Sequence, residues 1–241
     1  MTKQDLASTW HTEESLPDPL PDSPMPLFRA WFDEMVAAKH TPNPNAMTLG
    51  TVSAHGRPRA RVVLCRGIDP QLGHITFFTN YQSDKGRELT ANPHASATFL
   101  WDHAQRQARL EGRVTKAPDA DSDAYFAKRH WTKRVGAWAS HQSQPIGSRD
   151  ELIAAVGRVV EELDLDLAAL MAIDEGGPDV VIPRPPHWGG FRIWIDRLEL
   201  WCQGEGRIHD RARWHRELHE HREGELHTYT GGEWSATRLQ P

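Results

Sequence analysis

Two segments that lie far apart in the sequence carry arginines beside apolar residues that favour strands. The first contains Arg61 and Arg66 and is followed by Lys85, and the second contains Arg207 and Arg211. A planar guanidinium can bind phosphate oxygens through two hydrogen bonds, and a strand would hold it in a fixed position. These groups, with the aromatic residues around them, predict a site for a phosphorylated, flat and redox-active ligand.

Length and charge limit the class of protein. The chain has 241 residues and a formal net charge of −5, which predicts one large domain, or one domain with a tail. Because the charge is mild and negative, general nucleic-acid binding is not favoured, and we interpret the arginine clusters as local sites. We therefore expect no nucleic-acid partner.

The distribution of apolar residues indicates a cytoplasmic protein. The start of the sequence is polar, and no apolar run approaches the ~18 residues of a membrane span, so we expect no membrane partner. The two cysteines, Cys65 and Cys202, each lie in an apolar strand-like run. Two cysteines are too few for a disulfide framework, so we expect buried free thiols. We interpret Cys65 as a small buried side chain rather than a redox centre.

Prolines separate the start of the sequence from the predicted domain. Four prolines lie among acidic and small polar residues between positions 17 and 24. We therefore expect residues 1–25 to form an extended or disordered arm and residues 26–241 to form the domain. Within the domain, a helix is expected to start near Pro26 and to end before Pro42, since apolar residues recur on one helical face between them.

Most of the remaining sequence predicts antiparallel strands. Apolar runs bounded by turn residues cover 46–53, 60–66, 75–79, 96–101, 107–115, 191–195, 198–203 and 208–215, with a last hairpin that ends at residue 239. Short helices are expected over residues 83–89 and 121–129. This pattern predicts a barrel with peripheral helices, and the missing GxGxxG and GxxxxGK[ST] loops exclude the Rossmann and P-loop modes of binding.

The clearest helix signal follows Ser148. Its hydroxyl can accept a hydrogen bond from the backbone N–H of Glu151, and the Glu151 carboxylate can accept one from the N–H of Ser148, as in a capping box. Apolar residues from Leu152 to Leu163 then share one helical face. Residues 174–186 are rich in Gly, Pro and Asp and predict a loop, and a longer stretch from residue 165 has no role that we can assign.

Nine segments, taken in order, resemble the pyridoxamine 5′-phosphate oxidase family over nearly the whole chain, from about Leu27 to Pro241. They are 61–66, 77–85, 106–107, 125–126, 136–140, 142–143, 188–192, 201 and 207–211. The resemblance implies a mainly β (α+β) fold, an FMN-binding split β-barrel with peripheral helices. It also implies a homodimer with FMN at the subunit interface. The implied reaction, in vitamin B6 metabolism, oxidises pyridoxine or pyridoxamine 5′-phosphate to pyridoxal 5′-phosphate, with O2 as acceptor and H2O2 as product.

The resemblance also implies a set of FMN contacts. Arg61 and Lys85 would hold the FMN phosphate, with Gln142 and Ser143 near it. The stretch after Arg61 would pass the flavin ring, and two residues of the second arginine-rich region would complete the pocket. The full set is Arg61, Val62, Val63, Leu64, Cys65, Arg66, Phe78, Thr79, Lys85, Gln107, Gln142, Ser143, Trp201 and Arg211.

For the substrate, the resemblance implies a phosphate grip and a catalytic pair. Arg66, Tyr125 and Arg129 would bind the phosphate of the pyridine substrate, and Lys133 would add a cation there. Arg207 and His209 would face the pyridine ring near the reacting carbon. These residue types suit the chemistry, because FMN carries the redox step and the protein needs only to bind, orient and stabilise charge.

Some positions depart from the family pattern. Arg66 replaces a lysine, Lys133 replaces a serine and Asp84 replaces an arginine, while the start of the sequence lacks the family's basic stretch that covers the substrate. The substrate therefore stays open. One alternative keeps the fold and FMN but oxidises another ring compound, such as a phenazine precursor, and another is a non-enzymatic carrier of flavin or pyridoxal phosphate.

Other features have a structural and a functional interpretation. His215, His219, His221 and His227 are interpreted as solvated histidines on an exposed hairpin rather than metal ligands, because no HExxH motif is present, and no metal is expected.

Residues 207–211 are interpreted as a strand. Alternation would put Arg207, His209 and Arg211 on one side, where an anion would relieve their repulsion. We interpret Trp188-Gly189-Gly190 as a turn that shapes the cleft, and Trp138 as a core or dimer-interface residue.

Overall fold

The computed structural model describes residues 15–173, 180–224 and 226–241. The chain divides into two compact units, which we call the sheet unit and the helical unit. The sheet unit comprises Met1–Phe77, Asn92–Thr115 and Arg192–Pro241, and the helical unit comprises Phe78–Ala91 and Lys116–Phe191. In the described ranges, no helix is long and apolar enough to cross a membrane.

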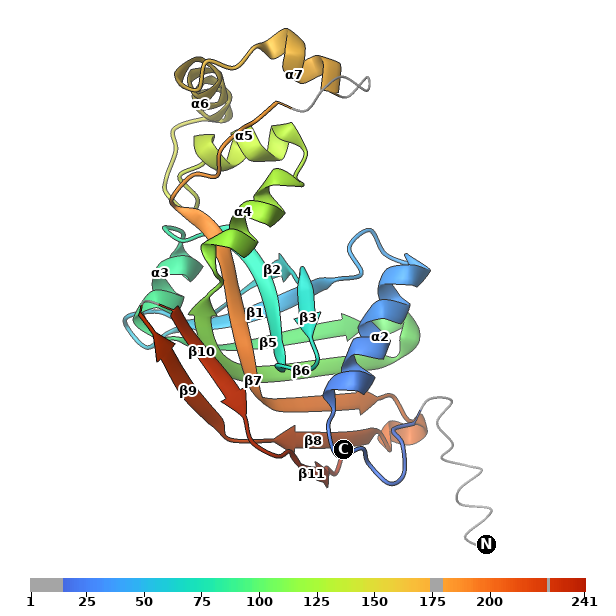
Figure 1. Cartoon of the computed structure of the whole chain (residues 1–241). Coiled ribbons are helices and arrows are strands. Elements are labelled where there is room, and N and C mark those ends of the chain that lie inside the picture. Colours follow the sequence, from blue (N-terminus) through green and yellow to red (C-terminus); the bar gives the residue numbers. More distant parts are fainter. Residues whose placement is uncertain (1–14, 174–179, 225) are drawn as a thin grey trace, which may run out of the picture. The chain divides into compact units, whose positions relative to one another are not determined.

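The sheet unit is built on antiparallel strands (Figure 1). The main path runs β11-β8-β7-β6-β5-β1-β2, with β4 paired to β3 and β7. The strands of this sheet are β1 Ala46–Val52, β2 Pro58–Leu64, β3 Gly67–Asp69, β4 His74–Asn80, β5 His94–Trp101, β6 Arg106–Lys116, β7 Trp188–Cys202, β8 Asp210–His215 and β11 Ser235–Arg238. Residues 78–80 of β4, residue 116 of β6 and residues 188–191 of β7 belong to the helical unit. A separate hairpin joins β9 Leu218–Glu223 to β10 Leu226–Gly231.

The register of β1 with its neighbours gives the sheet a core face and an open face. Leu49 lies opposite Arg61 on β2 and Ala97 on β5, and both Leu49 and Ala97 are buried. The alternate residues point the other way, because side chains alternate along a strand. On this open face Val62 is 66% exposed and Leu100 is 64% exposed. The sheet unit therefore presents a broad, partly apolar surface beside the predicted cofactor segment.

Helix α2, Met25–Ala38, covers the core face (Figure 1). It buries Met25, Phe28, Trp31 and Met35, and the Phe28 ring lies 5.5 Å from that of Phe99 on β5. Full burial of one such side chain contributes about 1.5–3 kcal/mol. The predicted helix is confirmed.

The helical unit contains five of the described α-helices. They are α3 Asp84–Ala91, α4 Asp119–Ala127, α5 Trp131–Ala139, α6 Arg149–Glu162 and α7 Leu167–Ile173. Their shared core includes Phe126, Val135, Val159, Leu170 and Trp188. Burial of Leu170 shows that α7, in a stretch for which the sequence suggested no role, contributes to this core.

The structure corrects several sequence predictions. The strands expected at 191–195 and 198–203 are one strand, β7, and it begins at Trp188, where we expected a turn. Ser148 does accept a hydrogen bond from the N–H of Glu151 at 3.1 Å. The Glu151 carboxylate, however, accepts from the N–H of Gly147 at 3.0 Å. The helix therefore has its N-cap without the reciprocal bond to the capping residue itself.

Helix α6 buries less than its sequence suggested. Among its apolar residues only Val159 is buried, and Leu152 and Ile153 are exposed. The loop predicted at 174–186 lies partly outside the described residues, and so does most of the predicted arm at 1–25. Residues 15–24, which are described, form no helix or strand, yet Leu16 is only 3% exposed.

Candidate active site

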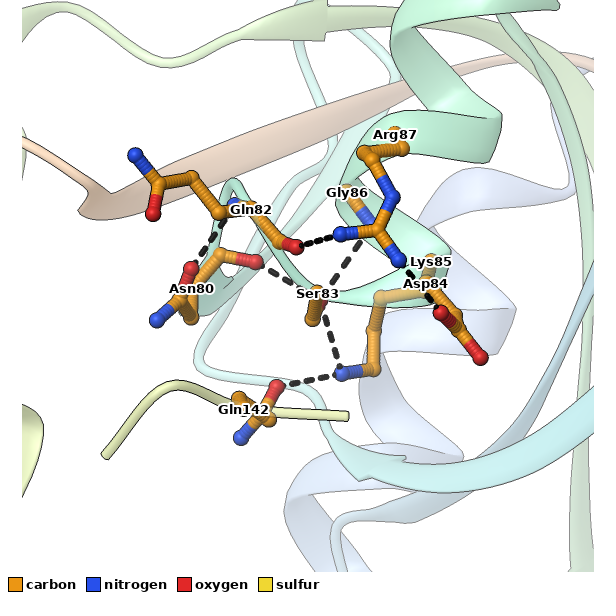
Figure 2. A network of polar contacts seen from close by, with 8 residues as sticks. All are labelled: Asn80, Gln82, Ser83, Asp84, Lys85, Gly86, Arg87 and Gln142. Carbon is orange, nitrogen blue, oxygen red and sulfur yellow. Dashed lines mark hydrogen bonds and ion pairs between the residues drawn. The ribbon is translucent and has the colours of Figure 1, made fainter. Parts of the chain in front are cut away.

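A lysine-centred polar network occupies the start of α3 in the helical unit (Figure 2). The Lys85 ammonium lies 2.6 Å from Gln142 Oε1, 3.1 Å from Thr79 Oγ1 and 3.3 Å from Ser83 Oγ. Ser83 accepts a hydrogen bond from the N–H of Gly86 at 3.3 Å and so caps the helix. A cation beside the N–H groups of a first helical turn is a suitable place for phosphate oxygens. The structure thus brings together the predicted FMN residues Thr79, Lys85 and Gln142.

The position that departs from the family pattern in this network is Asp84. Its carboxylate pairs with the Arg87 guanidinium at 2.7 Å, as Figure 2 shows. Arg87 also donates to the carbonyl of Gln82. The negative charge that Asp84 introduces is therefore partly balanced by a cation one turn later on the same helix.

The loop after α5 joins this network. Asn80 donates to the carbonyl of Ser140 at 3.2 Å, and Thr79 donates to Gln142 at the same distance. Ser143 adopts a φ of 73°, which is uncommon for a residue with a side chain. These bonds hold the predicted residue Gln142, and with it the adjacent Ser143, close to the end of β4.

A cavity of about 600 Å³ adjoins the network within the helical unit. Its lining includes Tyr81, Arg87, Lys116, His141 and Gln142. The Lys116 ammonium lies 4.6 Å above the Tyr81 ring, a favourable cation–π arrangement. Gln142 contacts both the cavity and Lys85.

The predicted substrate grip of the helical unit is organised by an aromatic stack. The rings of Phe78 and Tyr125 lie 4.0 Å apart and nearly parallel, and Trp188 lies 5.5 Å from Phe78 in the same orientation. The Arg129 guanidinium lies 4.7 Å above the Trp188 ring. Trp188, which we did not predict as a site residue, therefore supports Arg129 close to Tyr125. Lys133 is exposed on the first turn of α5.

In the sheet unit, the predicted residues of β2 divide between the two faces. Arg61 and Val63 lie opposite Leu49 and Met47 on the core side, whereas Val62 points to the open face. The Arg61 guanidinium donates to the carbonyl of Leu49 at 3.5 Å and to the Thr51 hydroxyl. One strand can thus present a cation on one side and an apolar surface on the other. Leu64 shares the side of Val62 because their positions differ by two.

The two predicted residues that follow β2 differ in exposure. Arg66 is exposed. Cys65 is a buried free thiol, and burial raises its pKa to about 12. The prediction of a buried free thiol is confirmed, and the raised pKa disfavours the thiolate, which is the reactive form. Cys202 is also free and buried, as predicted.

Several predicted cofactor residues share the open face. Gln107 on β6 lies opposite Leu100, and Trp201 on β7 lies opposite Arg211 on β8. Glu199, two residues before Trp201, is 3.7 Å from Arg109 of β6, which lies opposite Thr98. Val62, Gln107, Trp201 and Arg211 therefore lie on the same side of one sheet.

Glu199 is a partner of Arg211 that was not predicted from the sequence. This carboxylate is only 8% exposed, and one oxygen accepts from Arg211 Nη2 at 2.7 Å and from Nε at 3.2 Å. An ion pair of this kind fixes the plane of the guanidinium. The sequence does place Glu199 two residues before Trp201 on a predicted strand, and this spacing puts both side chains on one face.

The prediction that residues 207–211 alternate in a strand is wrong. Strand β8 begins at Asp210, and Arg207 ends the short 3-10 helix η2, Glu205–Arg207. Arg207 has a φ of 67° and follows Gly206, whose φ is 59°. A left-handed backbone at an arginine costs about 1 kcal/mol or more. This turn, rather than strand alternation, determines how the exposed Arg207 side chain is presented.

His209 is oriented by its immediate neighbours. Its ring lies 4.7 Å from that of Trp201, and its Nδ1 lies 3.1 Å from the backbone N–H of Gly204. Since Nδ1 accepts this bond, the neutral imidazole carries its proton on Nε2. The structure thus brings His209, Trp201 and Arg211 together with a donor N–H available on the histidine.

The histidines of the β9–β10 hairpin make local contacts. His221 hydrogen-bonds to Thr230 at 2.7 Å, and His227 pairs with Glu220 at 3.3 Å. Within the described part of the chain, no group of three or more metal-ligating side chains comes together. His215 lies on β8 and is exposed.

Two family profiles cover most of the chain. The profile described as "Pyridoxamine 5′-phosphate oxidase" matches residues 33–161, and the profile described as "Pyridoxine 5′-phosphate oxidase C-terminal dimerisation region" matches residues 188–241. A relative named pyridoxine/pyridoxamine 5′-phosphate oxidase from Cupriavidus necator is 44% identical over 224 residues, covering 93% of this chain and 91% of the relative. A protein of the same name from Bordetella pertussis is 44% identical over 214 residues, covering 89% and 93%.

Two solved structures share the fold. PhzG from Burkholderia lata, in complex with tetrahydrophenazine-1-carboxylic acid, has a TM-score of 0.75 and 27% identity, covering 95% of this chain and 99% of its own. A pyridoxamine 5′-phosphate oxidase-related FMN-binding protein from Nostoc punctiforme has a TM-score of 0.62 and 17% identity, covering 91% and 98%. The mainly β split-barrel fold with peripheral helices is thereby confirmed. On its sequence and on both profiles, the chain belongs to the pyridoxamine 5′-phosphate oxidase family.

Proposed function

We propose that this protein is an FMN-dependent oxidase that converts pyridoxine 5′-phosphate or pyridoxamine 5′-phosphate to pyridoxal 5′-phosphate, with O2 as acceptor and H2O2 as product. The observation that carries this proposal is that Tyr125 and Arg129 both lie close to the Trp188 ring. Both are good donors for a phosphate monoester, and the relatives that are 44% identical bear the name of this activity.

The donor set fits FMN. In the helical unit, Lys85, Gln142 and Ser143 would hold the FMN phosphate at the start of α3. In the sheet unit, Arg61 would add a second cation, while Val62, Gln107 and Trp201 would contact the flavin ring. When bound, the flavin would supply the acceptor for the hydride that leaves the substrate.

The chain's own residues would bind and orient the substrate. Arg129 and Tyr125, with Arg66 and Lys133, would bind the phosphate remote from the reacting carbon, so that binding energy is used for orientation. His209 would hold a proton on Nε2 toward the oxygen or nitrogen substituent of the pyridine ring. Arg207 would stabilise negative charge that develops during the reaction.

We also propose that the functional form is a homodimer with FMN at the interface. The exposed apolar side chains on the open face, Val62 and Leu100, support this assignment. The match of residues 188–241 to a profile described as a dimerisation region supports it as well.

A second candidate is the oxidation of another ring compound. Its specific support is the similarity to PhzG, which was solved with a tetrahydrophenazine carboxylic acid. A carboxylated tricycle carries no phosphate, so the two functions differ in their need for Arg129 and Tyr125.

The test is peroxide release by purified protein with added FMN. Pyridoxine 5′-phosphate, pyridoxamine 5′-phosphate, unphosphorylated pyridoxine and a reduced phenazine carboxylic acid would be compared. We expect turnover with the phosphorylated pyridines alone. A yellow, FMN-loaded protein that oxidises only the phenazine would establish the second candidate, and one inert to every compound would favour a carrier.

A further inference from the structure

Segments from the two ends of the described chain meet at the start of β8. Residues 15–21 and residues 238–240, which we call the clamp, both contact the stretch that contains His209 and Arg211. All of these residues belong to the sheet unit. The clamp is therefore placed to influence two residues that the proposed function uses, although the clamp itself belongs to neither the predicted cofactor site nor the predicted substrate site.

Asp210 is the centre of the first set of contacts. One carboxylate oxygen accepts from the N–H of Leu16 at 2.8 Å, and the other pairs with the Arg238 guanidinium. Arg238 also donates to the carbonyl of Pro17 at 3.0 Å and lies 3.8 Å from Asp18. Asp210 is thus tied to both parts of the clamp, and Arg238 links them to each other.

Arg211 receives the second set of contacts. Its carbonyl accepts from the N–H of Leu239 at 2.9 Å, and its guanidinium donates to the carbonyl of Gln240 at 3.0 Å. Arg238 lies opposite Ala212 in the β8–β11 ladder. The same guanidinium also donates to Glu199 of β7, so its plane is fixed by one neighbouring strand and by the closing segment at residue 240.

The segment that precedes β8 cannot provide this rigidity. Gly206 and Arg207 both have left-handed backbone angles in a short 3-10 turn, and isolated turns of this kind are weakly stabilised. Leu16, by contrast, is buried, and Trp214 of β8 donates to the carbonyl of Pro21 at 2.8 Å. Residues 15–21 of the clamp, which are tied to both Asp210 and Trp214, are therefore the firmer support for β8.

We propose that Arg238 is a positioning residue that holds His209 and Arg211 in their functional orientation through Asp210 and the backbone of residues 239–240. The role assigned to these two residues rests on the proposed function. Since a displacement of about 1 Å far from the reacting atoms can cost on the order of 100-fold in rate, the loss of this ion pair should be visible in catalysis as well as in stability.

The experiment compares Arg238→Ala and Arg238→Lys with wild type, and Arg222→Ala is the matched control. Arg222 is also an arginine paired with a carboxylate, that of Glu220 at 3.0 Å, but on the exposed β9–β10 hairpin. FMN affinity, the visible circular dichroism of bound FMN, kcat and KM would be measured. Hydrogen exchange of peptides covering residues 207–214 would be followed without FMN.

We expect Arg238→Ala to weaken FMN binding about tenfold, because Arg211 would no longer be held in place for a charge-assisted contact, and to change the flavin dichroism. It should also lower kcat on the order of 10- to 100-fold and raise exchange at 207–214. Arg238→Lys should show smaller changes than Arg238→Ala, because lysine keeps the positive charge but lacks the planar guanidinium. Arg222→Ala should match wild type.

The proposal is overturned if Arg238→Ala leaves the dichroism, kcat and exchange unchanged, or if Arg222→Ala alters them equally. Should Arg238→Ala fail to fold, Asp210→Asn, which keeps an acceptor but removes the charge, takes its place with the same expectations. A wild type that neither binds FMN nor releases peroxide would refute the proposed function, and the exchange at 207–214 would still decide whether the clamp orders β8.

Discussion

At the scale of single residues, the arginines of this chain are held by partners that their own neighbourhoods in the sequence do not reveal. Arg211 is bound by Glu199, and the Arg129 guanidinium lies over the Trp188 ring. A guanidinium contributes less to the free energy of ligand binding if its side chain is ordered only on binding, because immobilising a long side chain costs about 0.5–1.5 kcal/mol. The supporting residues therefore contribute to affinity although they need not touch the ligand.

Glu199 provides a direct test of this view. We expect Glu199→Gln to weaken FMN binding roughly tenfold, because a hydrogen bond to a charged group contributes about 1.5–3 kcal/mol and the neutral amide would hold Arg211 less firmly. Titration of the apoprotein with FMN, followed by flavin fluorescence, measures the change.

The matched control for Glu199→Gln is Glu111→Gln. Glu111 pairs with Arg109 at 3.6 Å and with Arg197 at 3.7 Å on the same open face. Since it makes no ion pair with Arg211 among the described residues, its substitution should leave FMN affinity near that of wild type. Equal effects of the two substitutions would mean that total charge on this face, not the orientation of Arg211, controls binding.

At the scale of elements, short strands and caps position the site, while α6 contributes little burial. Helix α6 relies on its N-cap, since only Val159 of its apolar residues is buried. When a helix buries little apolar surface, hydrogen bonds to its first backbone N–H groups contribute a larger fraction of its stability.

We therefore expect Ser148→Ala to lower the free energy of unfolding by about 1 kcal/mol. The cause is the loss of the 3.1 Å bond from the N–H of Glu151. Urea unfolding followed by circular dichroism gives the value. Ser148→Thr, which keeps the hydroxyl, should stay near wild type, and an equal loss in both variants would assign the effect to packing rather than to capping.

At the scale of the whole molecule, the open face of the sheet unit exposes two large apolar side chains among its polar and charged ones. Val62 and Leu100 expose 66% and 64% of their surface, and both point to the side that carries Gln107, Trp201 and Arg211. Apolar groups clustered on one face are typical of an interface between copies of a chain. FMN binding and assembly should then depend on each other.

Leu100→Asp should accordingly shift the protein toward monomer, because a charge at the centre of an apolar contact must be desolvated without a partner. Light scattering after size-exclusion chromatography reports the mass. Leu72→Asp is the control, since Leu72 is 47% exposed in the turn between β3 and β4. If both variants remain dimeric, the interface lies elsewhere.

The division between sequence and structure is clearest in the two arginine-rich segments. Hydrophobic alternation and turn residues were sufficient to predict β1, β2, β5 and β6 and the helix that starts at Met25, because local patterns determine those elements. The order of motifs was also sufficient to indicate the family, the fold and the residues expected to bind FMN. The same alternation failed at residues 207–211, where a left-handed turn at Gly206 and Arg207 delays the start of β8 to Asp210.

Only the tertiary structure decided which side chains support the site. The contacts between Arg211 and Glu199, between Arg129 and Trp188, and between the clamp and Asp210 join residues that are 12, 59 and up to 194 positions apart. Pairings over such separations depend on sheet register and on how the chain closes on itself. A local sequence pattern predicts whether a segment forms a helix or a strand, because each has its own period of apolar residues. It does not predict which residue of another strand packs against that segment.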